Sequence, residues 1–173
     1  RAAQVAPVYG MLAEDLDADG NLDLLLVGNS YAPEIVYGRM DASIGTTLMG
    51  DGKGNFQPVE RSRSGFFVDG DAKAIARLET AQGSTIVVTQ NNDSTRSFQM
   101  TGSATRSRIK ATPAESYAVL DLGTAKRKVD LGFGSTYLSQ TSRTILVNDR
   151  ITEVRLFDNR GQEKRVISFN KTQ

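Results

Sequence analysis

Carboxylates at alternate positions form the most chemically distinctive stretch of this chain. In "DLDADGNLD", Asp15, Asp17, Asp19 and Asp23 stand at positions 1, 3, 5 and 9 of a loop, with Gly20 at position 6. Alternate spacing lets carboxylates point inward from a tight turn, and glycine at position 6 permits the sharp bend. Such an oxygen-only cage suits a hard cation such as Ca²⁺, because four acids this close otherwise repel one another.

Positions 7 and 12 of the loop decide how the predicted cage is completed. Asn21 follows Gly20, and its backbone carbonyl is the predicted ligand at position 7. An EF-hand begins in the same way but needs an acidic ligand at position 12, where this chain has Leu26, and its loop lies between two helices. Here the flanks are strand-like, so we predict that Asp23 closes the cage. The alternative is a solvated acidic turn that binds no ion.

The elements that hold this loop are predicted to be strands. Short apolar, β-branched runs alternate with Gly, Asn and Asp, and helical periodicity is weak, so the predicted class is all-β. The turns "GDGKGN" and "DNRG" supply residues that tolerate positive φ. Strands are expected at residues 22–27, 46–49, 55–59, 74–78, 85–89, 117–122, 128–131, 144–147, 153–157 and 164–169.

Two units and a second module are predicted along the chain. "LDLLLVGNS" and "STIVVTQNND" are both apolar strands that end in Asn-containing turns, which indicates a weak repeat over about the first 100 residues. The polar stretch 101–108 is predicted to be a linker. We therefore divide the chain into residues 1–104 and residues 105–173.

Composition excludes several kinds of chemistry. The 173 residues include no cysteine and no histidine, which rules out disulfides, zinc–thiolate sites and Ser-His or Cys-His catalysis. With 21 basic and 20 acidic residues the net charge is +1, and the basic stretches "AKRKVD" and "TRSR" are small, so no nucleic-acid partner is expected. No run of residues is apolar and long enough for a membrane span.

The acidic loop and the strands after it resemble a known repeat. "DLDADGNLDLLLVGN" followed by "LMGDGKGNF" is similar to an FG-GAP/VCBS repeat, the blade of integrin-α-like β-propellers. The resemblance implies that the loop joins the first two strands of a blade and holds a structural Ca²⁺. Its ligands would be the side chains of Asp15, Asp17, Asp19 and Asp23 and the carbonyl of Asn21.

A second resemblance covers the C-terminal part. "GFGSTYLSQTS" is similar to the "GxGYLSQxS" element of the ASPIC/UnbV module, which often follows FG-GAP repeats. The matching residues are Gly132, Gly134, Tyr137, Leu138, Ser139, Gln140 and Ser142. The later hairpin "VRLFDNRG" has Phe157 and Asp158 where the family has Trp and Pro.

The two resemblances together predict a partial β-propeller of about two blades, followed by a small β-rich module. Closed propellers need about four to eight blades. We therefore expect that the remaining blades belong to a longer chain. Alternatively, another chain completes the ring, or the second module covers the open edge of the two blades.

The second unit lacks most of the acidic loop. "FFVDGDAKAIARL" keeps Asp69 and Asp71, but Lys73 and Ala74 stand where further ligands would be needed, so no metal is expected there. One interpretation is that the Lys73 ammonium replaces the cation and pairs with an acid. The alternative is a surface lysine.

A long insertion at residues 30–45 is the predicted ligand-binding surface. The candidate residues for a rim that binds a sugar or a peptide are Tyr31, Tyr37, Arg39 and Asp41. The alternative is that these side chains pack on a neighbouring blade. The expected function is a non-enzymatic, Ca²⁺-stabilised segment of a secreted or cell-surface protein that acts in adhesion or in binding a protein or glycan ligand. The alternatives are a carbohydrate-binding module, part of a polysaccharide lyase or hydrolase, or a purely structural C-terminal cap.

Overall fold

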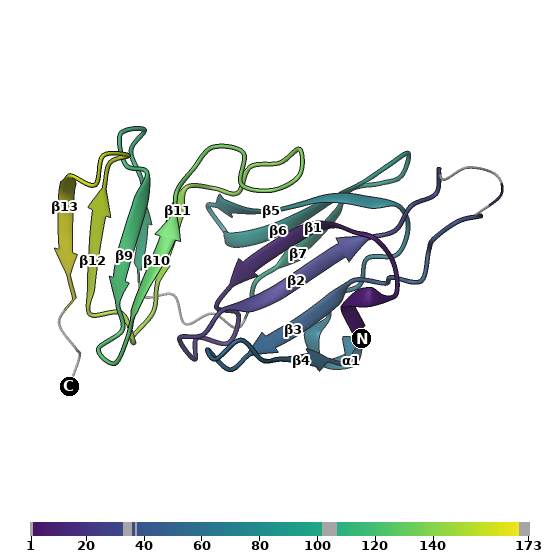
Figure 1. Ribbon diagram of the computed structural model, residues 1–173, viewed down its shortest axis with the longest axis horizontal. Helices are drawn as coiled ribbons and strands as arrows, with labels where there is room; N and C mark the ends of the chain where they lie inside the picture. The colour runs from purple at the N-terminus through teal and green to yellow at the C-terminus, as the bar shows by residue number, and fades with distance from the viewer. Residues whose placement is uncertain (1, 33–35, 37, 102–106, 170–173) are drawn as a thin grey trace.

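The computed structural model describes residues 2–32, 36, 38–101 and 107–169, and the strands that it contains form antiparallel sheets (Figure 1). The predicted all-β class is therefore confirmed. None of the sheets in these described ranges closes on itself, so the partial propeller stays a prediction.

The N-terminal half, residues 2–101, contains two sheets. A short 3-10 helix, η1 (Ala2–Gln4), precedes a four-stranded antiparallel meander with strands in chain order. Its members are β1 (Val8–Glu14), β2 (Asp23–Gly28), β3 (Thr46–Gly50) and β4 (Phe56–Val59). A single helical turn, α1 (Arg61–Ser64), leads to a three-stranded meander. Its members are β5 (Ala72–Thr80), β6 (Gly83–Gln90) and β7 (Arg96–Gln99).

The C-terminal half, residues 107–169, is a separate two-layer structure. One layer is a four-stranded sheet in the order β10-β9-β12-β13, and the other pairs β11 with β8. The strands are β8 (Ser107–Lys110), β9 (Tyr117–Asp121), β10 (Lys126–Asp130), β11 (Thr144–Val147), β12 (Glu153–Phe157) and β13 (Glu163–Ser168). All ten expected strands correspond to strands of the structure, with ends that differ by up to two residues.

Each half buries its own core. In the N-terminal half, Leu12 of β1, Val27 of β2 and Ile75 of β5 meet in one cluster, so the two meanders pack face to face. In the C-terminal half, Ile145 of β11 and Leu120 of β9 belong to a second cluster. The predicted boundary between residues 104 and 105 lies outside the described residues.

Two predictions about the first and middle segments were incomplete. Strand β1 was missed because Gly10 interrupts its apolar pattern. A Cβ at Gly10 would lie 2.8 Å from Cγ2 of Val27 and 3.0 Å from Cγ2 of Ile75, so glycine lets β1 pack closely on its neighbours. The predicted linker 101–108 was wrong at its end, because Ser107 and Arg108 already pair with β11. Residues 102–106 of that linker lie outside the described residues.

The two halves meet where residues 132–143, here called the docking segment, reach the free edge of β5 (Figure 1). The hydroxyls of Thr136 and Ser139 donate to the carbonyl of Ile75 at 2.9 and 3.2 Å. The backbone N–H of Ser142 donates to the carbonyl of Arg77 at 2.7 Å. Because these contacts satisfy backbone groups that an edge strand leaves open, the docking segment covers the edge of the β5 sheet.

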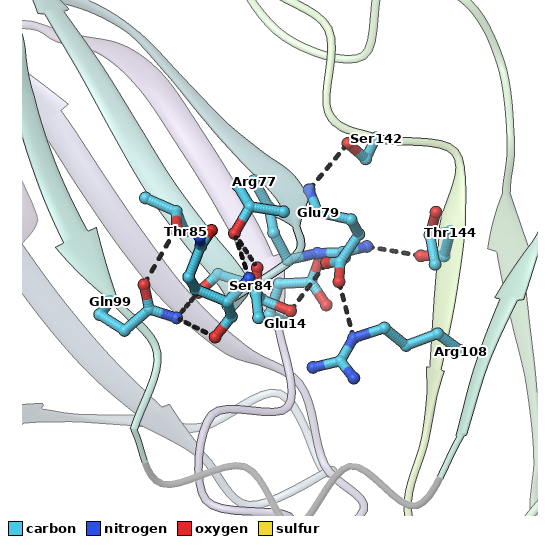
Figure 2. Close-up of polar contacts among 12 residues, drawn as sticks. Glu14, Arg77, Glu79, Ser84, Thr85, Gln99, Arg108, Ser142 and Thr144 are labelled. Carbon is cyan, nitrogen blue, oxygen red and sulfur yellow. Dashed lines mark hydrogen bonds and ion pairs between the residues drawn. The ribbon is translucent and has the colours of Figure 1, made fainter.

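A buried arginine adds an ionic contact at this edge (Figure 2). The Arg77 side chain is 4% exposed; its Nε lies 2.7 Å from Oε1 of Glu14, and its Nη1 contacts Glu79. Its Nη2 donates to the carbonyl of Thr144 at 2.6 Å, so one guanidinium joins β1, β5 and β11. Arg108 of β8 reaches Glu79 as well, with Nε 2.8 Å from Oε2. This role of Arg77 was not predicted from the sequence.

Candidate metal centre

The acidic loop, residues 15–23, joins β1 to β2, as the family resemblance implies. Glu14 pairs with Asp23 across the antiparallel ladder, so the carboxylates lie on the turn that connects the two strands. Gly20 has a φ of 90° within this turn. A side chain there would be strained, and its Cβ would lie 3.1 Å from Cδ of Arg150. The predicted need for glycine at position 6 is therefore confirmed.

Three of the predicted carboxylates come together. Asp15, Asp17 and Asp19 each offer one oxygen, and these oxygens all lie within 4.8 Å of one another. Ca²⁺–oxygen distances are about 2.3–2.6 Å, so two oxygens on one ion lie at most about 5 Å apart. Among the residues that the structure describes, the spacing of this trio fits a single cation.

Asp15 has an unusual hydrogen-bond arrangement. Its Oδ2 accepts from the N–H of Gly20 at 3.1 Å and from Nδ2 of Asn148 at 2.9 Å. Its Oδ1 is buried and has no hydrogen-bond partner within the described part of the chain. A buried carboxylate oxygen without a donor is costly, and a bound cation would remove that cost.

The electrostatics of Asp15 agree with this geometry. Burial raises the pKa of its carboxyl, and the neighbouring Asp19 and Asp23 raise it further, while Arg127 and the Gly20 N–H act in the opposite direction. The net pKa is above the usual value, so the ion-free fold disfavours the charged form. A cation at the loop would reverse that preference.

Asp17, Asp19 and Asn21 stabilise the turn itself. The N–H of Asp19 donates to Oδ1 of Asp17 at 3.1 Å. Asn21 holds both oxygens of Asp19, with its N–H 2.7 Å from Oδ1 and its Nδ2 2.8 Å from Oδ2. Asn21 thus contacts the carboxylates through its amide groups, and its carbonyl as a ligand stays a prediction.

Asp23 lies deeper than the other three acids. It is 1% exposed, its Oδ2 accepts from the N–H of Leu16 at 2.8 Å, and its Oδ1 accepts from the N–H of Gly50 at 2.9 Å. It is not part of the mutually close trio found among the described residues. Burial raises its pKa despite these two donors. Asp23 therefore ties the loop to the end of β3, and its place as an ion ligand stays a prediction.

The C-terminal half also contacts the acidic loop, a contact that was not predicted from the sequence. Besides Asn148, Arg127 of β10 contributes, with Nη1 donating to the carbonyl of Gly20 at 3.2 Å. Asn148 and Asp15 are 133 positions apart. A contact of that separation leaves no local pattern in one sequence, although the buried polar residue directly after the apolar strand β11 is a weak signal.

The segment predicted to be the second loop does not join two strands: Asp69 and Asp71 precede β5, and Lys73 lies within β5. Nζ of Lys73 lies 2.6 Å from Oδ1 of the buried Asp71, 3.0 Å from the carbonyl oxygen of Asn29 and 3.7 Å from the centroid of the Tyr9 ring. The Lys73 side chain is 24% exposed. The structure therefore favours the interpretation in which the Lys73 ammonium pairs with an acid over that of a solvated surface lysine.

The predicted ligand-binding rim is brought together in part. Cζ of Arg39 stacks 4.9 Å from the centroid of the Tyr31 ring, and Ser30 pairs with Met40 to close the insertion. Arg39 and Asp41 are exposed. Tyr37 lies outside the described residues.

A cavity of about 710 Å³ opens between the two N-terminal sheets. Leu25, Phe66, Phe98 and Met100 contribute to its lining, and Asp17 is the one carboxylate among the lining residues. Glycoside hydrolysis commonly uses a pair of carboxyl groups that flank the bond, and this lining does not provide such a pair.

Comparison with known proteins gives no family for the chain. No protein-family model matches it, and no curated protein matches it either. The resemblances to FG-GAP/VCBS repeats and to the ASPIC/UnbV module therefore stay predictions that rest on the quoted motifs. None of the helices that the structure describes has the length or the apolar character to cross a membrane.

Proposed function

We propose that this chain is a Ca²⁺-stabilised, non-enzymatic β segment of a secreted or cell-surface protein, in which the acidic loop holds a structural ion and an exposed surface binds a protein or glycan. The observation that carries the proposal is the buried, unpartnered Oδ1 of Asp15 beside the carboxylates of Asp17 and Asp19, within the described residues. The ion would supply positive charge to this trio.

The chain's own residues prepare the loop for that charge. Gly20 allows the bend, Asn21 fixes the carboxylate of Asp19, and Asp23 anchors the turn to the backbone of Gly50. An all-oxygen ligand set favours Ca²⁺ over softer metals. Extracellular modules bind Ca²⁺ at about 10⁻⁴–10⁻³ M, which suits the millimolar concentrations outside cells. The four-stranded meander that carries the loop is also compatible with a propeller blade.

Calcium titration of the intact chain tests this proposal. Because an ion that binds the folded state alone stabilises it, 100-fold excess over the dissociation constant should add about 2.7 kcal/mol to the free energy of unfolding. The measurement compares unfolding curves in Ca²⁺ and in chelator. Asp17→Asn should remove the effect, whereas Asp130→Asn, an exposed acid on β10, should keep it. Equal curves for the wild type with and without Ca²⁺ would reject the ion.

A carbohydrate-binding function is the second candidate. The exposed Arg39, stacked on the ring of Tyr31, offers an aromatic and cationic surface of the kind that sugars contact. A glycan array with the wild type, Tyr37→Ala and Arg39→Ala tests it. Binding that both variants lose would support a lectin-like module, and cleavage of a bound glycan would instead indicate an enzyme.

A further inference from the structure

Asn148, in the turn after β11, has an amide group with a fixed orientation. It is 8% exposed, and its Oδ1 accepts from the N–H of Arg150 at 3.1 Å. Because that side of the amide already accepts a hydrogen bond, the donor Nδ2 must face Oδ2 of Asp15 at 2.9 Å. Asn148 is thus a dedicated donor to the acidic loop.

This donor determines which oxygen of Asp15 stays open. Oδ2 accepts from both the N–H of Gly20 and Asn148, whereas Oδ1 is buried and has no partner in the described part of the chain. Asn148 therefore holds the carboxylate in the rotation that leaves one oxygen for another ligand. Partners that orient a metal ligand commonly change metal affinity by about 10–100-fold when they are removed.

A second contact from the same half fixes the bend of the loop. Nη1 of Arg127 donates to the carbonyl of Gly20 at 3.2 Å, and Cδ of Arg150 lies where a Cβ on Gly20 would be only 3.1 Å away. The C-terminal half thus contacts position 1 and position 6 of the loop together.

The position of Asn148 relative to the loop is set by the docked arrangement of the two halves. The docking segment covers the edge of β5, and Arg77 joins Glu14, directly before the loop, to the carbonyl of Thr144 in β11 (Figure 2). Asn148 is the first residue after β11. Strand β11, which accepts the hydrogen bond from Arg77, is therefore followed directly by Asn148, the donor to Asp15.

We infer that Asn148 is a positioning residue for the cation, so that the metal site is complete only when the C-terminal half is docked on the N-terminal half. The inference rests on the proposed function, since it requires that the acidic loop binds Ca²⁺. Coupling of this kind is reciprocal, so Ca²⁺ stabilises the docked arrangement by the same factor by which docking raises Ca²⁺ affinity.

Calorimetric titration of Ca²⁺ into the full chain tests the role of Asn148. Asn148→Ala should raise the dissociation constant about 10–100-fold. Asn91→Ala is the matched control, because Nδ2 of Asn91 donates to Oδ2 of the buried Asp71 at 3.1 Å, a carboxylate that pairs with Lys73 of β5. The control should leave the Ca²⁺ dissociation constant unchanged. Asn148→Leu keeps the branched shape and the number of heavy atoms without the donor, and it serves if the alanine variant fails to fold.

Hydrogen exchange of the wild type tests the coupling without any variant. The N–H of Ser142, which donates to Arg77 across the two halves, should exchange more slowly in Ca²⁺ than in chelator. This inference alone is overturned if the wild type binds Ca²⁺ and the Asn148 variants bind it equally well. It is also overturned if the wild type binds Ca²⁺ and the exchange of the Ser142 N–H does not change. A wild type that binds no Ca²⁺ overturns the proposed function and this inference with it.

Discussion

Two carboxylates of the N-terminal half, Asp15 in the acidic loop and Asp71 directly before β5, have opposite electrostatic surroundings. In the acidic loop, Asp15 has a buried oxygen without a partner among the described residues, and burial leaves its pKa raised. In the second unit, burial also acts to raise the pKa of Asp71, but the Lys73 ammonium 2.6 Å from its Oδ1 and the hydrogen bond from Asn91 to its Oδ2 outweigh burial, so the pKa is lowered. The chain supplies a lysine ammonium to the buried carboxylate of Asp71, whereas the pKa of Asp15 stays raised although Arg127 acts to lower it. Under the proposed function, an ion from solution supplies the missing charge at the acidic loop.

The largest expected effect comes from removing the internal cation. Lys73→Met leaves the buried Asp71 charged without its partner, which should cost about 3 kcal/mol in the free energy of unfolding. Urea denaturation measures it, with Lys53→Met, an exposed lysine in the "GDGKGN" turn, as a control that should stay within about 0.5 kcal/mol of the wild type. Adding Asp71→Asn to Lys73→Met should restore part of the loss. Equal stability of Lys73→Met and wild type would show that Lys73 is an ordinary surface lysine.

The next effect concerns the acid whose oxygen has no partner. Asp15→Asn keeps the shape and an acceptor for Asn148 but removes one charge from the trio, so it should abolish the Ca²⁺-dependent gain of about 2.7 kcal/mol. Ion-free Asp15→Asn should be no less stable than ion-free wild type, because the repulsion among the acids falls. Thermal unfolding in chelator and in Ca²⁺ measures both effects. An Asp15→Asn variant that still gains stability from Ca²⁺ would place the ion elsewhere.

Placing a lysine in the acidic loop tests whether an ammonium can replace the proposed ion there. Asp17→Lys places an ammonium beside Asp15 and Asp19, as Lys73 stands beside Asp71. Because Asp17 is exposed, the gain should be modest, about 0.5–1 kcal/mol in the ion-free protein, and Ca²⁺ should no longer change the unfolding midpoint. Asp17→Asn is the charge-removal control, and it should gain less. An ion-free Asp17→Lys less stable than Asp17→Asn would contradict the proposed equivalence.

The smallest effect is the response to pH, which has opposite signs for the acidic loop and for Asp71. The raised pKa values of Asp15 and Asp23 make the ion-free fold lose stability as pH rises from 3.8 through those raised values. The lowered pKa of Asp71 contributes stability that is present above 3.8 and lost as pH falls through the lowered value. Protons also compete with the ion, so the Ca²⁺ dissociation constant should rise as pH falls toward the raised pKa values.

Calorimetric titrations at about pH 7 and about pH 5 check the competition between protons and Ca²⁺. Asn91→Ala, whose change lies beside Asp71, is expected to follow the wild type across this range. A dissociation constant that does not change as pH falls toward the raised pKa values would mean that no carboxylate with a raised pKa binds the ion.

Local patterns predicted the acidic loop, its glycine and the ten expected strands, because alternation, turn residues and ligand spacing act over a few positions. They did not predict β1, because Gly10 serves contacts with Val27 and Ile75 rather than strand propensity. Nor did they predict Asn148 or Arg77, whose partners Asp15 and Glu14 lie 133 and 63 positions away. Asp23 looked like a fourth equivalent acid, and its burial against Leu16 and Gly50 depends on β3.

The most direct test of the account is a calorimetric titration of Ca²⁺ into the intact, chelator-treated chain, with Asp17→Asn alongside. We expect one ion per chain, a dissociation constant at or below about 10⁻³ M and no binding by Asp17→Asn. An absence of binding heat in the wild type together with an unfolding midpoint unchanged by millimolar Ca²⁺ would contradict it.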